Sequence, residues 1–153
     1  MDARLVTAAH RVLIALNRAG VCYALCGGMA VAAHGIGRAT DDIDILLASE
    51  DLAAASAALA ADGWLTTSEA ITFPDGITLH RRLLFEGKGH HILDLLIPQA
   101  GSGWLDQRER SDFAGAIAYV LGRPALIAMK RLAGRPQDLA DIARLEELGD
   151  GRT

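Results

Sequence analysis

The chain has 153 residues, of which 51% are hydrophobic and 22% are charged, and its formal net charge is −4 at pH 7. This length and composition predict one folded domain over residues 1–153 and exclude a disordered chain. No apolar run approaches the ~20 residues of a membrane span, and residues 1–20 lack a signal peptide's unbroken apolar stretch. We therefore expect a soluble, cytoplasmic protein with no membrane partner. The mildly acidic balance disfavours a nonspecific coat on nucleic acid, and the two cysteines are too few for a disulfide scaffold.

The hydrophobic pattern of the first half predicts alternating helices and strands. These elements are expected at residues 4–19 (helix), 21–26 (strand), 29–34 (helix), 43–47 (strand), 51–61 (helix) and 64–67 (strand). The second half predicts an antiparallel hairpin and two further helices. Its elements are expected at residues 79–85 and 91–97 (hairpin strands), 99–112 (loop), 116–121 (short strand or turn), and 124–133 and 136–148 (helices). This order predicts an α/β (α+β) fold, with a core at about 1–121 and a C-terminal helix pair at about 124–148.

A glycine turn lies between the first predicted strand and the short helix. Gly27 and Gly28 occupy this junction, and glycines there let backbone N–H groups approach a phosphate at the positive end of a helix. Taken alone, such a pair is more often only a tight turn. Its meaning therefore depends on what lies beside it.

Two acidic side chains begin the next predicted strand. Asp42 and Asp44 are two residues apart, so both carboxylates lie on one face, while Ile43 and Ile45 anchor the other face in the core. Adjacent carboxylates repel, and Mg²⁺ (or Mn²⁺) with substrate phosphates would relieve that repulsion. Asp94 stands among apolar residues in a later strand, where an unpaired charge is unfavourable. Together the three acids predict a metal site for phosphoryl or nucleotidyl transfer, although Asp42 alone could be an ordinary turn residue.

The segment LCGGMAVAAHGIGRATDDIDILL, residues 25–47, resembles the polymerase-β-type nucleotidyltransferase superfamily. It is closest to the small AbiEii/DUF1814-like nucleotidyltransferases. The resemblance implies a minimal nucleotidyltransferase fold, a mixed sheet flanked by helices. It also implies that Gly27 and Gly28 bind phosphate, that Asp42 and Asp44 bind metal, and that Asp94 is a third metal ligand that helps to activate the attacking hydroxyl.

The resemblance extends to residues 125–145, where Lys130, Arg135, Asp138 and Asp141 fall on matching positions. Lys130 could reach the triphosphate, or it could be an ordinary helix charge. We expect the other three to form an ion network that positions Lys130.

Other polar residues have both a functional and a structural interpretation. Arg38 and Thr40 are assigned to nucleotide binding because they precede the acidic pair, but they could be surface and turn residues. Arg81 and Arg82 face opposite sides of their strand, so one of them is expected to line the cleft. The histidines at 80, 90 and 91 are interpreted as turn or strand-surface residues because no partner has zinc-ligand spacing.

The sequence thus predicts a nucleotidyltransferase that moves a nucleoside monophosphate from ATP, GTP or another nucleoside triphosphate to an acceptor hydroxyl. The acceptor could be a protein, a tRNA or a small molecule, and a toxin–antitoxin role is one possibility. Three alternatives stay open: a non-catalytic nucleotide- or partner-binding module such as an antitoxin subunit, an antibiotic-modifying nucleotidyltransferase, and a metal-dependent phosphohydrolase. Because the chain is short, we also expect a partner chain or a second copy of it.

Overall fold

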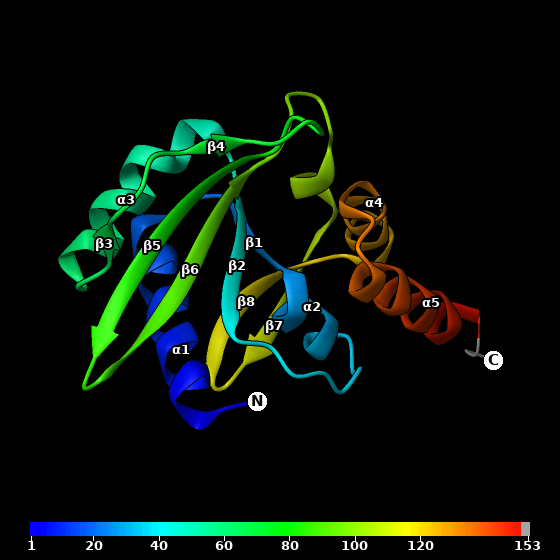
Figure 1. The fold of residues 1–153 in the computed structure, drawn as a ribbon, viewed down its shortest axis with the longest axis horizontal. Helices are drawn as coiled ribbons and strands as arrows, with labels where there is room; N and C mark the ends of the chain where they lie inside the picture. The colour runs from blue at the N-terminus through cyan, green and yellow to red at the C-terminus, as the bar shows by residue number, and fades with distance from the viewer. Residues whose placement is uncertain (151–153) are drawn as a thin grey trace.

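The computed structural model describes residues 1–150 as a mixed sheet with helices on both of its faces (Figure 1). The helices are α1 (Ala3–Ala19), α2 (Gly27–Ala33), α3 (Leu52–Ala61), α4 (Arg123–Ala133) and α5 (Pro136–Asp150). The strands are β1 (Tyr23–Cys26), β2 (Asp42–Leu47), β3 (Leu65–Thr66), β4 (Ile71–Thr72), β5 (Thr78–Glu86), β6 (Gly89–Ile97), β7 (Arg108–Phe113) and β8 (Ala116–Leu121). Two short 3-10 helices lie at Ser49–Asp51 and Trp104–Gln107.

The sheet has eight strands in the order β3-β5-β6-β2-β1-β8-β7, and β4 pairs with β5. Strand β2 is parallel to β6, and β1 is parallel to β8, while the other pairs are antiparallel. The predicted mixed α+β architecture with a C-terminal helix pair is therefore confirmed.

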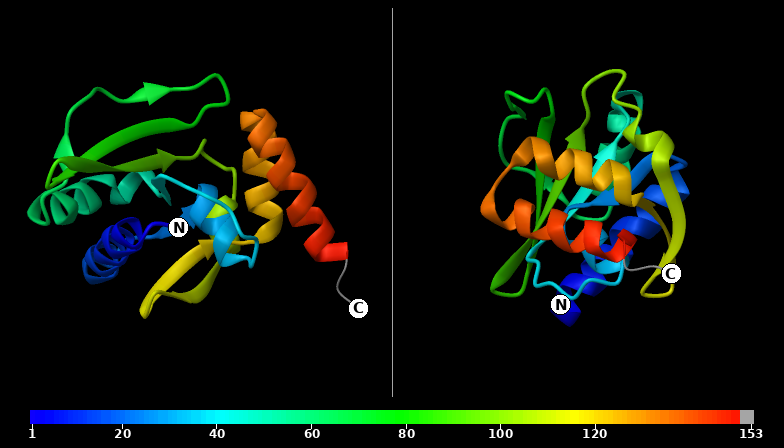
Figure 2. Two further views of the ribbon diagram at one scale, coloured as in Figure 1. Left: turned by 60° about the horizontal axis from the view of Figure 1, so that its bottom comes forward. Right: turned by 90° about the vertical axis from the view of Figure 1, so that its right-hand side faces the viewer.

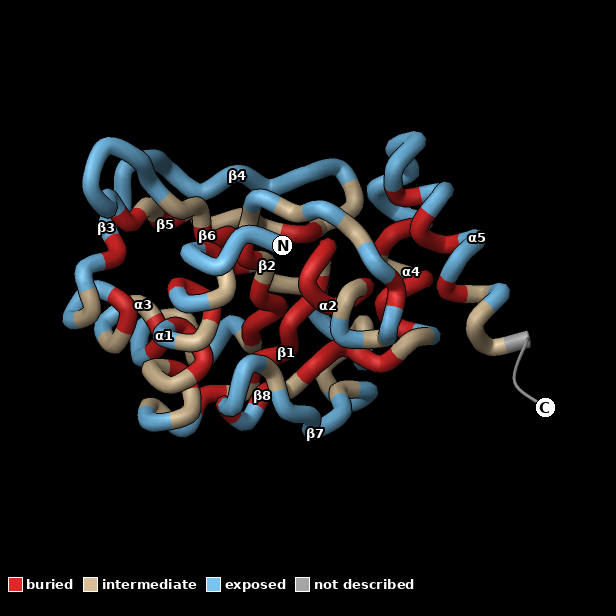
Figure 3. Tube along the Cα trace, turned by 90° about the horizontal axis from the view of Figure 1, so that it is seen from below, coloured by how far each residue is buried: buried red, intermediate tan, exposed pale blue. Residues whose placement is uncertain are grey.

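Helices α1 and α3 pack together on one face of the sheet (Figure 2). Asp2 begins α1 by accepting a hydrogen bond from the backbone N–H of Arg4 at 2.7 Å, and Gly20 ends it in the left-handed conformation. The apolar stripe of α1 is buried, as are Ile43 and Ile45 of β2. The core therefore lies between these helices and the central strands, which form the buried interior in Figure 3.

Helices α4 and α5 pack against each other at one end of the molecule (Figure 2). A proline in the first turn favours the start of α4, because proline lacks the N–H that a first turn leaves unpaired. Gly134 then ends α4 in the left-handed conformation, and Pro136 begins α5. This sharp turn folds α5 back along α4.

Three local predictions differ from the structure. The stretch 99–112, expected to be a loop, contains most of β7, which pairs with β8 at the edge of the sheet. Its sequence RERSDF is largely exposed, and charged side chains are common on edge strands because they discourage pairing with other chains. Helix α2 begins at Gly27 rather than at 29. The two-residue strand β4 was not predicted. Residues 116–121, predicted as a short strand or a turn, form a strand.

Over residues 1–150, none of the helices is both long enough and apolar enough to cross a membrane.

Candidate active site

Three aspartates meet on the face of the sheet opposite α1 and α3. Parallel pairing of β2 with β6 sets Asp44 beside Asp94, and Asp42 lies two residues earlier on the same face of β2. One carboxylate oxygen from each residue lies within 4.8 Å of the others. The arrangement follows from sequence alternation, since Ile43 and Ile45 fix the opposite face in the core.

The electrostatics of this cluster favour a bound cation. Burial, followed by the charges of Asp94 and Asp42, raises the pKa of Asp44 to about 7. Burial and then Asp94 also raise the pKa of Asp42. Three converging carboxylates supply the hard oxygen ligands that Mg²⁺ and Mn²⁺ prefer, so the residues present fit such an ion. With a cation between them, both groups would ionise more readily.

Arg81 holds the third acid of the cluster from the neighbouring strand. Its Nε donates to Oδ1 of Asp94 at 2.8 Å, and a terminal nitrogen donates to Oδ2 at 2.9 Å. Antiparallel pairing of β5 with β6 places the two residues opposite each other. Arg82 points the other way, is buried and donates to Ser56 of α3. The structure thus assigns the cleft-lining position to Arg81.

The strands align these groups in a single row across the sheet. Cys26, the residue before Gly27, pairs with Asp44, Asp44 with Asp94, and Asp94 with Arg81. Neighbouring strands are ~4.8 Å apart, so the row spans roughly 14 Å. The glycine turn lies at one end of the row and Arg81 at the other.

Close approach requires both glycines, and at Gly27 the backbone conformation requires glycine as well. Gly27 has φ +63°, and a Cβ there would overlap the Asp44 carboxylate. At Gly28, a Cβ would lie 2.7 Å from Oγ1 of Thr40 and 2.8 Å from a guanidinium nitrogen of Arg38. Thr40 also donates to the carbonyl of Asp42 at 3.3 Å. The turn and the loop before β2 are therefore packed against each other.

Buried charges connect that loop to the C-terminal helices. Lys130 of α4 donates to Asp141 of α5 at 2.9 Å and lies 3.6 Å from Asp138. Asp141 also pairs with Arg38 at 3.1 Å, and Asp138 pairs with Arg135 at 2.7 Å. Burial acts to raise the pKa of Asp138, but its hydrogen bond to Arg135 and the nearby positive charges outweigh burial and lower it. The expected pairing of Lys130 and Arg135 with these acids is present.

The glycine turn, the three aspartates, Arg81 and the basic residues near the C-terminal helices line one open cleft with a volume of about 720 Å³, and Asp141 lies outside its lining. The cleft brings together every residue that the sequence assigned to the site: Gly27, Gly28, Arg38, Thr40, Asp42, Asp44, Asp94 and Lys130. Their individual roles stay predictions. The bidentate Arg81–Asp94 pair was not predicted, although side-chain alternation along β5 indicated that Arg81 or Arg82 faced the cleft.

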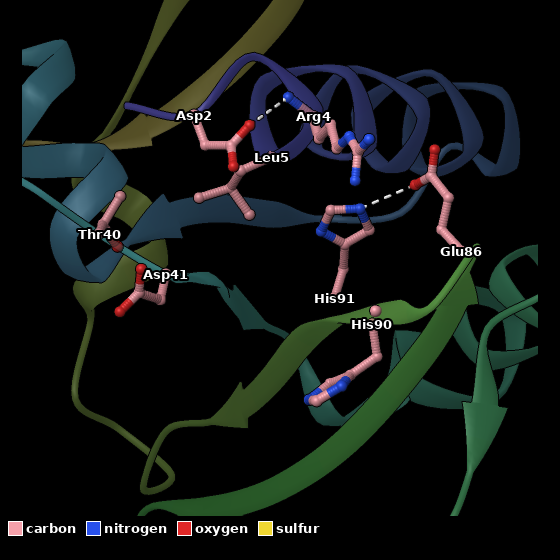
Figure 4. Close-up of a pocket in the computed structure, with 9 residues that line it drawn as sticks. Asp2, Arg4, Leu5, Thr40, Asp41, Glu86, His90 and His91 are labelled. Atoms are coloured by element: carbon pink, nitrogen blue, oxygen red, sulfur yellow. Dashed lines mark hydrogen bonds and ion pairs between the residues drawn. The ribbon is translucent and has the colours of Figure 1, made fainter.

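A smaller cavity of about 250 Å³ lies beside the start of α1 (Figure 4). It shares Thr40 and Asp41 with the main cleft. On its far side, Nε2 of His91 lies 2.8 Å from Glu86. Within the described residues 1–150, the group of three that could hold a metal is the aspartate cluster.

Comparison with solved structures defines the fold class. ANT(2'')-Ia in complex with adenylyl-2''-tobramycin matches 94% of this chain and 88% of its own, with TM-score 0.64 and 19% identity. Lincomycin-bound LnuA, a lincosamide antibiotic adenylyltransferase, matches over 97% and 98%, with TM-score 0.64 and 16% identity. A proposed nucleotidyltransferase of Thermotoga maritima matches over 99% and 96%, with TM-score 0.69 and 12% identity. The chain therefore has the nucleotidyltransferase fold.

No protein-family model matches the sequence, and no curated protein matches it.

Proposed function

We propose that this chain is a Mg²⁺-dependent nucleotidyltransferase that moves a nucleoside monophosphate from a nucleoside triphosphate to an acceptor hydroxyl. The observation that carries the proposal is the row from the glycine turn through Asp44 and Asp94 to Arg81. The glycine turn, to which we assign the phosphates, lies at one end of the row, and Asp94, to which we assign the incoming hydroxyl, lies near the other, which supports the proposal. In-line displacement at phosphorus needs the leaving and attacking oxygens on opposite sides, and this layout provides it.

The proposed reaction balances as a direct transfer. The acceptor oxygen forms a bond to the α-phosphorus, the bond from that phosphorus to the bridging oxygen breaks, and pyrophosphate leaves. The hydroxyl proton moves to the carboxylate of Asp94. Arg81 holds both oxygens of Asp94, and each of these oxygens has a second lone pair that can accept the proton. Mg²⁺ on Asp42, Asp44 and Asp94 would neutralise the charge that develops on the phosphate oxygens.

The basic residues of the cleft support the phosphate end of the row. Arg38 lies against Gly28. Arg38 and Lys130 both form salt bridges with Asp141. We assign these cations, with Thr40, to orienting the triphosphate while Gly27 and Gly28 give its oxygens close access to the backbone.

Two finer assignments belong to the proposal. The motifs over 25–47 and 125–145 favour an AbiEii-like nucleotidyltransferase, and with it a toxin–antitoxin role. An antibiotic-modifying enzyme is the second candidate, favoured by the apolar residues in the cleft lining, among them Leu79 and Leu96. Both candidates use the same row of residues and differ in the acceptor. A partner chain or a second copy stays a prediction.

Transfer of label from α-³²P-labelled ATP, GTP, CTP and UTP tests the activity. The wild-type chain is incubated with Mg²⁺ and candidate acceptors beside the double variant Asp42→Asn/Asp44→Asn. Asp112→Asn is the matched control, because Asp112 lies on edge strand β7, and its Oδ1, which caps Gly115, is retained in asparagine. We expect transfer and pyrophosphate release by the wild type and the control only. Equal transfer by the double variant would contradict the assignment, and release of inorganic phosphate alone would indicate a phosphohydrolase.

A further inference from the structure

The cleft continues beyond the row of charged groups as an apolar slot. Leu96 follows Asp94 by two residues on β6, and Leu79 precedes Arg81 by two residues on β5, so both lie on the cleft face. The two leucines are register partners, and they form the next row, roughly 7 Å beyond Asp94. Both line the cleft and are half-buried.

Helix α4 and the turn between β4 and β5 also line this cleft. They contribute large apolar side chains to the cleft lining, namely Leu126, Met129 and Leu132 from α4 and Phe73 from the turn. Phe73 is 40% exposed and Leu132 is 52% exposed. Apolar side chains of this size, left exposed around a concave site, are typical of a place where an apolar ligand is bound.

The charges of the cleft show what kind of ligand suits the slot. Each of the four basic side chains in its lining already pairs with an aspartate: Arg38, Arg81, Lys130 and Arg135. The lining also contains six aspartates. A polyanionic acceptor such as an RNA would bring further negative charge to the Asp94 side of the cleft, where Arg81 is already paired, and that contact is unfavourable.

The position of the slot identifies it with the acceptor. The glycine turn, to which the pyrophosphate is assigned, lies at the opposite end of the row. An in-line attack therefore brings the acceptor hydroxyl in from the Asp94 side. The part of the acceptor that carries this hydroxyl then lies over Leu96 and Leu79.

We propose, resting on the proposed function, that the acceptor is a small hydroxylated molecule whose apolar, non-anionic body packs between the Leu79–Leu96 pair and Met129. Its hydroxyl lies at Asp94. Leu79, Leu96 and Met129 determine acceptor specificity and do not contribute to nucleotide affinity.

Binding of a neutral apolar fluorophore, N-phenyl-1-naphthylamine, tests the slot without knowledge of the acceptor. It is titrated into the full chain with and without Mg²⁺ and the non-transferable analogues α,β-methylene-ATP and α,β-methylene-GTP. The variants are Met129→Gln, which keeps side-chain length on α4, and Leu79→Thr, which keeps strand propensity. Leu139→Gln is the matched control, since Leu139 is 56% exposed on α5 and lies outside the cleft lining.

We expect fluorophore and nucleotide to bind together. Each slot variant should lower the affinity for the fluorophore about tenfold, as expected when the apolar surface of a pocket is reduced. The affinity for the nucleotide should stay within twofold of the wild type. With labelled nucleotide, transfer should favour neutral alcohols with a cyclic apolar body over an oligoribonucleotide with free hydroxyls.

Other outcomes overturn the proposal in distinguishable ways. Displacement of the fluorophore by nucleotide, or weaker nucleotide binding in the slot variants, would assign the slot to the nucleobase. Preferred transfer to the oligoribonucleotide would refute an apolar acceptor, and an equal loss in Leu139→Gln would refute the slot itself. If the wild type binds no nucleotide, the proposed function fails, and the acceptor assignment fails with it.

Discussion

Replacing Gly27 with alanine tests whether the metal site depends on the close approach of the glycine turn to Asp44. Gly27 has φ +63°, and an added Cβ would lie 2.8 Å from Cγ of Asp44. Ordinary carbon contacts begin at 3.4 Å, so the carboxylate must retreat by at least about 0.6 Å. That shift exceeds the ~0.5 Å within which functional groups must be held.

Gly20→Ala is a matched control for backbone strain. Gly20 has φ +67°, and an added Cβ would meet nothing within 4 Å. Both variants should therefore lose about 1–2 kcal/mol of unfolding free energy, because alanine is disfavoured in the left-handed region, and the overlap with Asp44 adds to this loss in Gly27→Ala alone. Only Gly27→Ala should also lose the site, since its Cβ displaces Asp44.

Urea unfolding measures the common loss of stability, and electron paramagnetic resonance of Mn²⁺ measures the site. We expect Mn²⁺ affinity to fall at least tenfold in Gly27→Ala, and kcat for nucleotidyl transfer to fall about 10²-fold, as expected for an active-site displacement approaching 1 Å. Gly20→Ala should match the wild type in both. If Gly27→Ala bound Mn²⁺ as tightly as Gly20→Ala does, the close approach to Asp44 would have no functional role.

Three further predictions concern charge. Because the pKa of Asp44 is raised to about 7, the folded chain binds more protons than the unfolded chain between about pH 4 and 7. The stability that this group contributes should fall as pH rises through that window, and Mn²⁺ affinity should rise and then level off above about pH 7. Urea unfolding and Mn²⁺ titrations at several pH values check both, and a slope of unfolding free energy unchanged in Asp44→Asn would contradict the assignment. Lys130→Met removes the cation that two buried aspartates share, while Arg135 and Arg38 still pair with them, so it should lower the unfolding free energy by about 1.5–3 kcal/mol. The exposed Arg131 pairs with one glutamate, so Arg131→Met should cost less than about 1 kcal/mol, and equal losses would argue against a buried network. Arg81→Gln should bind free Mn²⁺ about tenfold more tightly by calorimetry, because it removes a cation that competes for both oxygens of Asp94. Weaker Mn²⁺ binding would show instead that Arg81 helps to build the site.

The sequence predicted those parts of the site that depend on neighbouring residues better than those that depend on the pairing of distant strands. Alternation along a strand put Asp42 and Asp44 on one face, and the cost of burying a lone charge singled out Asp94. The register between β2 and β6 could not be predicted, because Asp44 and Asp94 are 50 residues apart and no local pattern fixes their pairing. The same reason hid the contact between Arg81 and Asp94, which depends on how the β5–β6 hairpin is aligned.

The edge strand β7 shows a different limit. Strand prediction relies on apolar alternation, but an exposed edge strand needs little apolar surface, so its charged sequence resembled a loop.

The packing of the C-terminal helices could not be predicted from the sequence either. The salt bridge from Arg38 to Asp141 depends on the angle at which α5 returns along α4, and side-chain composition does not encode that angle.

The parallel pairing of β2 with β6 makes the cation site a reporter of strand alignment. Side chains alternate along a strand, so a slip of one residue would turn Asp94 into the core and present Leu95 to the cleft. The three carboxylates could then not converge, and the oxygen ligands for a divalent ion would no longer lie together. During refolding, Mn²⁺ binding should therefore appear only after this distant pairing has formed, later than the helical signal of α1, because contacts between distant segments form slowly.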